Sequence, residues 1–101
     1  MFEIQILIPV ASNEGVTFAP AHHDAFEAFV IDRFGGLTFA GTVQGAWLDN
    51  GQLYRDTCRL YQVAVTSLTD GGKVGEVVSF AKVHYAQLAI CLRYLGIVEI
   101  L

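Results

Sequence analysis

The strongest constraint on the fold is a pair of alternating segments that flank a turn signal. In residues 37–47 the apolar side chains keep to alternate positions, and residues 53–68 resume the same pattern. A period of two is typical of β-strands that bury one face. Asp49-Asn50-Gly51 lies between the two segments, and an Asn-Gly pair at this place favours a tight turn. The sequence therefore predicts one long antiparallel hairpin folded at Asn50.

The rest of the chain supplies a strand and a helix on each side of this hairpin. Pro20 suits the first turn of a helix, and Gly35-Gly36 are typical of a helix end. A second helical pattern of apolar residues is longer and closes at Gly96. In chain order we expect a strand over 2–9, a helix over 20–34, the hairpin, a helix over 73–95 and a strand over 97–101.

This β-α-β-β-α-β order predicts an α+β domain with the ferredoxin-like fold. Such a fold has a four-stranded antiparallel sheet with two helices on one face, and here the second and third strands form the long hairpin. A chain of 101 residues has room for one domain, so we expect residues 1–101 to form a single ferredoxin-like domain. The order predicts no activity, because this fold hosts many unrelated functions.

The composition predicts self-association. Apolar residues make up 53% of the chain and charged residues only 16%, against a usual charged share of about 25%. A domain this small cannot bury so much apolar surface within itself, so we expect a homo-oligomer, either a dimer or a trimer. Two surfaces are candidates: the hairpin tip with Trp47, Leu48, Leu53 and Tyr54, and an extra apolar line along the second helix with Phe80, Val83, Gln87, Ile90 and Tyr94. The alternative for the second surface is a helix that lies deep between the sheet and the loops.

The same numbers disfavour other partners. Ten acidic and six basic residues give a net charge of −4 without any Lys/Arg cluster, so we expect no nucleic-acid binding. No apolar run approaches the roughly 18 residues of a membrane span. The N-terminal run meets Pro9 early and reads as a strand rather than a signal peptide. Cys58 and Cys91 lack the spacing of a zinc site, so we expect reduced thiols, a cytoplasmic protein, and no metal or other cofactor.

Two arginines of the hairpin define a candidate ligand site. If the turn centres on Asn50, Gly41 lies opposite Arg59 and Gly45 lies opposite Arg55 on one face. Glycine leaves space beside each guanidinium, and two guanidiniums can hold a small carboxylate or phosphate. The candidate ligand-binding residues are Arg55, Arg59, Trp47 at the mouth, Gly41 and Gly45.

The same register pairs apolar residues with one another, and it pairs Phe39 with Tyr61 and Trp47 with Leu53. This agreement supports the register. The alternative role for the two arginines is structural, because each can pair with an acid such as Glu27 or Asp32, or with a neighbouring subunit.

Asp56 is the candidate acid–base residue. The predicted register places it near Gln44 on the opposite face of the hairpin, where burial would let the carboxylate act as a general base. The alternative is a strand carboxylate that is hydrogen-bonded for structural reasons.

His22-His23-Asp24 is the densest group of potential metal ligands. Neighbouring side chains of a helix point about 100° apart and do not readily share one ion. We therefore interpret these residues as solvated residues of a first helical turn and expect no metal site.

Three short segments carry a family resemblance. They are Phe34-Gly35-Gly36-Leu37-Thr38, Gln44-Gly45-Ala46-Trp47 and Asp49-Asn50-Gly51-Gln52-Leu53-Tyr54-Arg55-Asp56. They resemble the F-x-G-L-T, Q-G-x-W and G-x-x-x-R-E signatures of the DUF3574 family of small bacterial proteins of unknown function. Asp56 stands where that family tends to have glutamate, and the tail departs from its F-x-Q-x-x-V ending. The resemblance covers residues 2–9 and 34–67 and implies a ferredoxin-like fold but no activity.

No motif specific to a reaction is present, so the sequence leaves the function open. The first hypothesis is an oligomeric domain that binds a small anion or a protein partner at the arginine site. The alternative is a small cofactor-free enzyme that resembles the dimeric ferredoxin-like monooxygenases or isomerases. Its cavity would be lined by Phe26, Phe29, Phe39 and Tyr61, although these aromatic residues are more simply core. A cavity of more than about 300 Å³ that holds Asp56, a histidine or an arginine would favour the enzyme. A nucleotide sensor resembling PII signalling proteins ranks last, because the hairpin turn is tight and lacks phosphate-gripping basic residues.

Overall fold

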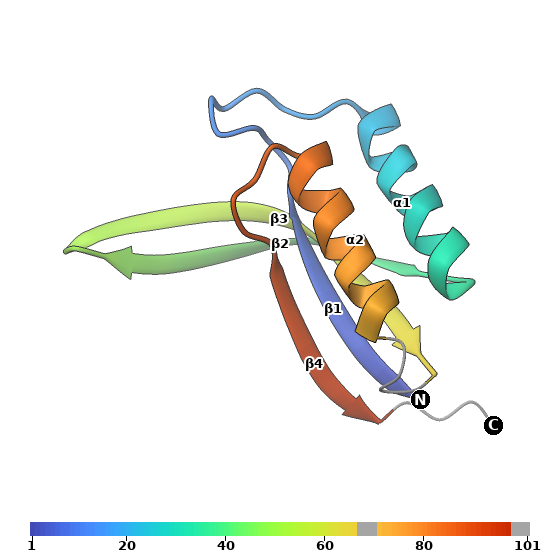
Figure 1. The fold of residues 1–101 in the computed structure, drawn as a ribbon. Coiled ribbons are helices and arrows are strands. Elements are labelled where there is room, and N and C mark those ends of the chain that lie inside the picture. Colours follow the sequence, from blue (N-terminus) through green and yellow to red (C-terminus); the bar gives the residue numbers. More distant parts are fainter. Residues whose placement is uncertain (67–70, 98–101) are drawn as a thin grey trace.

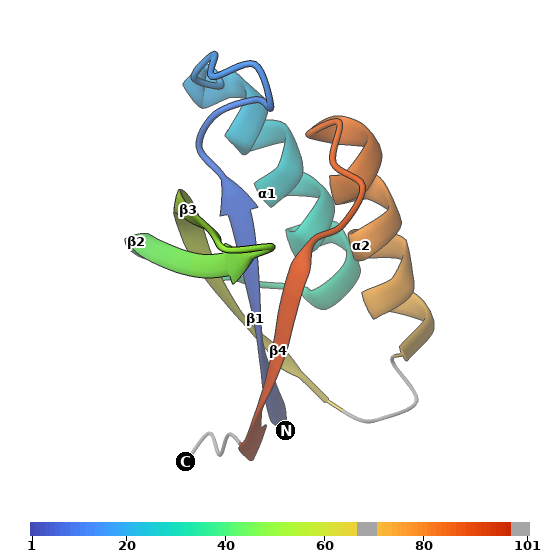
Figure 2. The ribbon, with the colours of Figure 1, turned by 90° about the vertical axis from the view of Figure 1, so that its left-hand side faces the viewer.

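One antiparallel sheet forms a layer of the molecule, and two helices form a second layer on one of its faces (Figures 1 and 2). The computed structural model describes residues 1–66 and 71–97. In chain order the elements are β1 (Phe2–Pro9), α1 (Pro20–Phe34), β2 (Thr38–Asp49), β3 (Gln52–Val65), α2 (Gly71–His84) and β4 (Cys91–Ile97). The four strands lie side by side in the order β2-β3-β1-β4. The predicted ferredoxin-like α+β fold is confirmed.

The alternation of β1, which lies between β3 and β4, decides where the core sits. Ile4, Ile6 and Ile8 are buried beneath the helices, whereas Gln5 and Leu7 on the other face are half-buried. The buried apolar core consists of Ile4, Ile6, Ile8, Phe26, Val30, Tyr61, Val63, Val65, Val74, Val77, Ala81 and Tyr85. Both helices lie on this side, so the opposite face of the sheet is uncovered in the described part of the chain (Figure 2).

α1 begins and ends as its sequence predicts. Pro20 occupies its first turn, where a missing backbone N–H costs nothing. Gly35 ends the helix with a left-handed φ of 80°, and its N–H donates to the carbonyl of Ile31 at 2.7 Å. Among the described residues, neither helix has the length and apolar character needed to cross a membrane.

The predicted helix over 73–95 is wrong in its second half. α2 ends at His84, and residues 91–97 form β4. The physical reason is that β1 is an inner strand, and the N–H and C=O groups of its second edge need partners. β4 supplies them, with Leu92 opposite Ile6. The helical spacing of apolar residues in this segment was therefore overridden by strand pairing.

This correction removes the apolar line predicted along the second helix. Ile90 and Tyr94 do not lie on a helix. Phe80 does, but it is half-buried and stacks on Phe29 of α1. Of the final strand predicted over 97–101, residues 98–101 lie outside the described residues.

A two-residue turn closes the hairpin. Asn50 and Gly51 both have positive φ, 50° and 78°, as in the turn type that matches the twist of a hairpin. The turn is centred between these residues rather than on Asn50, so it places Trp47 opposite Tyr54. The predicted pairing of Trp47 with Leu53 is wrong by one position.

A β-bulge at Gly41 changes the register a second time. Between Phe39 and Thr42, β2 has one residue more than the segment of β3 that it pairs with, and Gly41 has a φ of 99°. Phe39 therefore lies opposite Tyr61, as predicted, whereas Thr42 and not Gly41 lies opposite Arg59.

Gly41→Ala should lower the free energy of unfolding by about 1–2 kcal/mol. The expected loss comes from backbone strain, because a residue with a Cβ rarely adopts a φ of 99°. It does not come from a steric clash, since the added Cβ meets no atom within 4 Å. Gly45→Ala is the matched control, since it lies in the same strand, has no positive φ, and also leaves its Cβ in open space. We expect the control to change stability by less than about 0.5 kcal/mol. Urea unfolding measures both variants, and equal losses would contradict the assigned role of the bulge glycine.

The outer half of the hairpin projects past the helices (Figure 1). Its tip carries Trp47, Leu48, Leu53 and Tyr54, which are exposed to 50%, 70%, 51% and 42%. The apolar tip named as a candidate surface is therefore exposed, and a single copy leaves it bare.

Candidate functional site

The hairpin has two chemically different faces, because alternate residues of a strand point to opposite sides. One of them, the polar face, holds the cross-strand pairs Thr42–Arg59, Gln44–Thr57 and Ala46–Arg55. The other, the aromatic face, holds the pairs Val43–Cys58, Gly45–Asp56 and Trp47–Tyr54. Arg59 reaches α1, so the polar face lies on the helix side of the sheet. Arg55 and Arg59 therefore share a face, and Trp47 lies on the other one.

A charged centre at the base of the polar face joins β3 to α1. Arg59 Nε donates to the hydroxyl of Tyr61 at 2.8 Å, and this hydroxyl donates to Oε2 of Glu27 at 2.7 Å. Arg59 Nη2 donates to the same carboxylate oxygen at 3.2 Å. The guanidinium carbon also lies 3.9 Å from the centroid of the Phe39 ring, a favourable cation–π distance. These contacts hold the guanidinium of Arg59 in one orientation.

Burial determines the protonation state of Tyr61 in this centre. The residue is fully buried. Burial, together with the hydrogen bond to Glu27, raises the pKa of Tyr61 far above its usual value. The phenol therefore stays protonated at neutral pH and donates to the Glu27 carboxylate. The side chains of Glu27 and Arg59 are 25% and 22% exposed, so their ion pair is only partly screened by water.

Arg55 extends the positive charge along the polar face. It is exposed, and within the described residues it makes no ion pair or hydrogen bond. The Nη1 group of Arg59 likewise makes no hydrogen bond to a described residue. Thr57 lies between the two arginines on β3, and Thr42 and Gln44 lie across from them on β2. Two guanidiniums beside hydroxyl and amide groups can bind a carboxylate or phosphate through charge-assisted hydrogen bonds.

The other three residues predicted for the ligand site lie elsewhere. Trp47 is on the aromatic face, where its ring stacks on Tyr54 with 4.7 Å between centroids. Gly41 occupies the bulge, and Gly45 lies opposite Asp56 rather than Arg55. The register is the cause, because a slip of one residue moves a side chain to the other face of a sheet.

Asp56 does not meet the condition set for an acid–base residue. Its side chain is exposed, and Oδ2 accepts a hydrogen bond of 3.0 Å from Nε1 of Trp47. It lies opposite Gly45 and not near Gln44, so the predicted neighbour is wrong as well. The hydrogen bond to Trp47 matches the structural alternative.

The interpretation of the adjacent histidines as solvated residues is wrong. His23 is only 4% exposed, and its Nδ1 lies 2.7 Å from the hydroxyl of Tyr85. His22 Nε2 lies 2.6 Å from the carbonyl oxygen of His84, and His84 Nε2 lies 2.7 Å from that of His22. The partners are His84, the last residue of α2, and Tyr85, which directly follows it, and no local sequence pattern indicates these contacts. The described residues contain no group of three or more His, Cys, Asp or Glu side chains that could hold a metal ion.

His22 and His84 belong to a continuous stack of rings along the seam between the helices. In this seam stack the successive centroid distances are 4.8, 3.8, 5.0 and 4.1 Å for Phe18–His22, His22–His84, His84–Phe80 and Phe80–Phe29. Arg33 covers the last ring, with its guanidinium carbon 4.3 Å from the Phe29 centroid, and Arg33 Nε donates to Glu76 at 2.6 Å. The seam stack therefore fixes α1 against α2 and positions Glu27, which lies on α1 one turn after His23.

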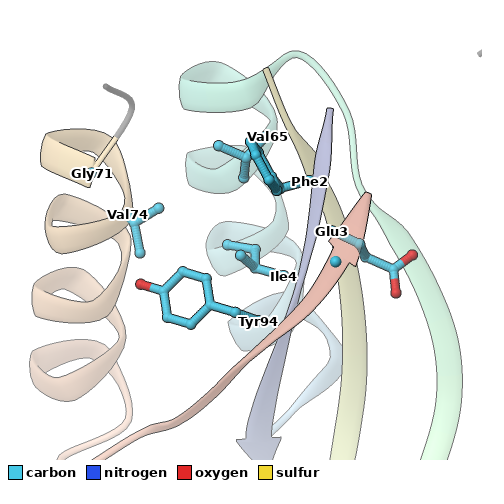
Figure 3. Close-up of a pocket in the computed structure, with 8 residues that line it drawn as sticks. Phe2, Glu3, Ile4, Val65, Gly71, Val74 and Tyr94 are labelled. Carbon is cyan, nitrogen blue, oxygen red and sulfur yellow. The ribbon is translucent and has the colours of Figure 1, made fainter. Parts of the chain in front are cut away.

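A cavity of about 430 Å³ lies between the start of α2 and the sheet (Figure 3). Its lining residues are Phe2, Glu3, Ile4, Val65, Gly71, Val74, Tyr94 and Gly96. Tyr94 points from β4 toward Val74, whereas the carboxylate of Glu3 points away from the cavity (Figure 3). The cavity is large enough for a small molecule, but it holds neither Asp56 nor a histidine or arginine. Its lining therefore does not meet the condition set for the enzyme hypothesis.

Sequence reasoning missed the polar neighbours of the arginines. Arg55, Thr57 and Arg59 stand at every second position of β3, and this parity was a usable signal for one shared face. The opposing residues Thr42 and Gln44 carried no such signal, because their place depends on the bulge.

Comparison with known proteins establishes the fold and nothing narrower. No family model matches the chain, and no curated protein matches its sequence, so membership of the DUF3574 family stays a prediction. A phage SAM lyase in complex with S-methyl-5'-thioadenosine has a similar structure, with a TM-score of 0.70 and 15% identity over 94% of this chain and 80% of that one. The divalent cation tolerance protein CutA1 from Thermus thermophilus has a TM-score of 0.65 and 13% identity over 97% and 84% of the two chains. The periplasmic divalent cation tolerance protein CutA from Archaeoglobus fulgidus has a TM-score of 0.66 and 12% identity over 99% and 86%.

Proposed function

We propose that this chain is a self-associating domain that binds a small anionic ligand on the polar face of its hairpin. One observation carries the proposal. Arg59 is held in one orientation by Glu27 and Tyr61, while Arg55 on the same exposed face has no partner within the described residues. A guanidinium that is already oriented loses less conformational freedom on binding, and this favours affinity.

The neighbouring groups suit a carboxylate or phosphate that also carries hydroxyl or amide groups. Thr42, Gln44 and Thr57 are exposed on the polar face and can donate or accept hydrogen bonds. The Glu27 carboxylate is already engaged by Arg59 and Tyr61, so it does not leave an uncompensated negative charge beside the ligand.

Self-association is supported by the apolar hairpin tip, whose large side chains are about half exposed or more in one copy. A cytoplasmic location is supported by the cysteines, since Cys58 and Cys91 are both free and such thiols suit a reducing compartment. Burial raises the pKa of the Cys58 thiol, which keeps it protonated and unreactive.

Titration calorimetry with inorganic phosphate and pyrophosphate tests the anion site. The wild-type chain should bind at least one of these probes, and Arg55→Ala should weaken binding about tenfold or more through the loss of one charge-assisted contact. Arg55 is exposed and unpaired within the described residues, so this variant should keep the fold. Lys82→Ala is the matched control, because it removes the same charge from an exposed position on α2. Equal weakening in both variants, or no binding of either probe, would count against the site.

A second candidate ligand is an adenosine derivative. The phage SAM lyase of the same fold is described in complex with S-methyl-5'-thioadenosine. In this chain Phe39 is 42% exposed at the edge of the Arg59 centre, where a purine could stack. S-methyl-5'-thioadenosine and SAM should be titrated into the wild-type chain and into Phe39→Ala. If the chain binds one of these nucleosides, loses this binding in Phe39→Ala and does not bind phosphate, the adenosine derivative replaces the small anion as the candidate ligand.

A further inference from the structure

The uncovered face of the sheet continues into the aromatic face of the hairpin, and the two carry complementary rows of side chains. Across the sheet, an apolar row is formed by the paired residues Leu60, Leu7 and Cys91. The next row on the same face, two positions along each strand, is formed by Gln62, Gln5 and Arg93. Arg93 is exposed and makes no ion pair within the described ranges. This face therefore presents an apolar row with the positive charge of Arg93 beside it.

The aromatic face of the hairpin has the same spacing with the opposite charge. Trp47 and Tyr54 form a stacked pair across the strands, and the adjacent row holds Asp56 opposite Gly45. Asp56 uses Oδ2 to accept from Trp47, and Oδ1 has no partner in the described part of the chain. In both surfaces the charged residue lies two positions from the apolar row, a step of about 7 Å along a strand.

We propose that the aromatic face of one hairpin docks on the uncovered sheet face of a second copy of this chain. Trp47 and Tyr54 of one copy cover Leu7 and Leu60 of the other, and Asp56 lies beside Arg93 across the contact. The inference rests on the self-association in the proposed function and names the surface that mediates it. A buried aromatic pair with a charged contact at its rim is the usual arrangement of a specific interface.

This arrangement keeps assembly and ligand binding on separate faces. The polar face points to the helix side, so docking through the aromatic face leaves Arg55 and Arg59 open. Substitutions at Asp56 or Arg93 should therefore change the assembly without changing the affinity for phosphate. This separation makes the two proposals testable in one set of proteins.

A charge swap tests the contact on the full chain by light scattering coupled to size exclusion. At micromolar concentration the wild type should have a multiple of its 11.0 kDa mass. Asp56→Lys or Arg93→Glu alone places like charges together and should shift the population to 11.0 kDa, whereas the double variant should restore the assembly. Circular dichroism checks that each variant is folded. Trp47, the only tryptophan, gives an independent reading on the unmodified protein, because its emission should shift to the red on dilution through dissociation.

Each outcome has a defined meaning. Dissociation of both single variants and recovery in the double variant support the interface. An assembled wild type whose single variants stay assembled overturns this interface but leaves self-association in place. A wild type of 11.0 kDa, with a Trp47 emission that is independent of concentration, overturns both the interface and self-association. Phosphate titration of the same proteins reports on the anion site separately.

Discussion

Lowering the pH from 7 to 5 should destabilise the folded chain through His23 alone, by at most about 2 kcal/mol. Burial, with Arg59 and His22 nearby, lowers the pKa of His23 below 6.5, and Glu27 and Asp24 offset this only in part. The unfolded chain therefore binds a proton that the folded chain excludes. The stability contributed by neutral His23 is complete above pH 6.5 and is lost as the pH falls below it. The slope is at most about 1.4 kcal/mol per pH unit for one proton.

Urea unfolding at several pH values between 7.5 and 5 measures this effect. His23→Gln cannot titrate and keeps an oxygen that can accept the hydrogen bond of the Tyr85 hydroxyl, so its stability should depend less on pH. His84→Gln is the matched control, because it removes a histidine of the seam stack but leaves His23 and Tyr85 together. The prediction fails if the wild type and His23→Gln lose the same stability over this range.

Arg59→Leu should lower the free energy of unfolding by about 2–4 kcal/mol. The substitution removes the donors to Tyr61 and Glu27 and leaves the Glu27 carboxylate, which is only 25% exposed, without its cation. The loss of stability should be smaller than for a fully buried ion pair, because water still reaches the side chains of Arg59 and Glu27. Arg55→Leu is the matched control in the same strand and on the same face. It should change stability by less than about 0.5 kcal/mol, since Arg55 is exposed and has no described partner.

A double-mutant cycle separates the ion pair from the packing of Arg59 on Phe39. Glu27→Gln should lower the free energy of unfolding less in the Arg59→Leu background than in the wild type. In that background the Glu27 charge that the substitution removes has already lost the guanidinium of Arg59. Equal stability losses for Arg59→Leu and Arg55→Leu would show that the hydrogen bonds to Glu27 and Tyr61 contribute nothing to the fold.

The elements that were predicted correctly are those with signals inside a few consecutive residues. β1 ends at a proline, α1 runs from Pro20 to a glycine stop, and Asn50-Gly51 closes the hairpin. Each of these signals acts through backbone dihedral angles, which depend mainly on the residue itself and its neighbours. The end of α2 had no such signal, because both a helix and a strand can bury the apolar residues after His84.

The candidate site was predicted only in part for the same reason. Placing Arg55 and Arg59 on one face needed only the period of a strand. The residues that lie beside the arginines depend on the register of the hairpin. Gly41, with a φ of 99°, changes that register by a full residue. Glu27, one of the acids considered for an arginine, proved to be the partner of Arg59.

The order of strands and helices, the turn and the shared face of Arg55 and Arg59 follow from the amino-acid sequence, since each rests on local geometry or on residue spacing. The tertiary structure alone decided that residues 91–97 pair with β1, that His22 meets His84, and that Trp47 faces away from the arginines. These features join segments that are distant in the chain or depend on a register. They are determined by hydrogen bonds and packing that exist only once the sheet and both helices have come together.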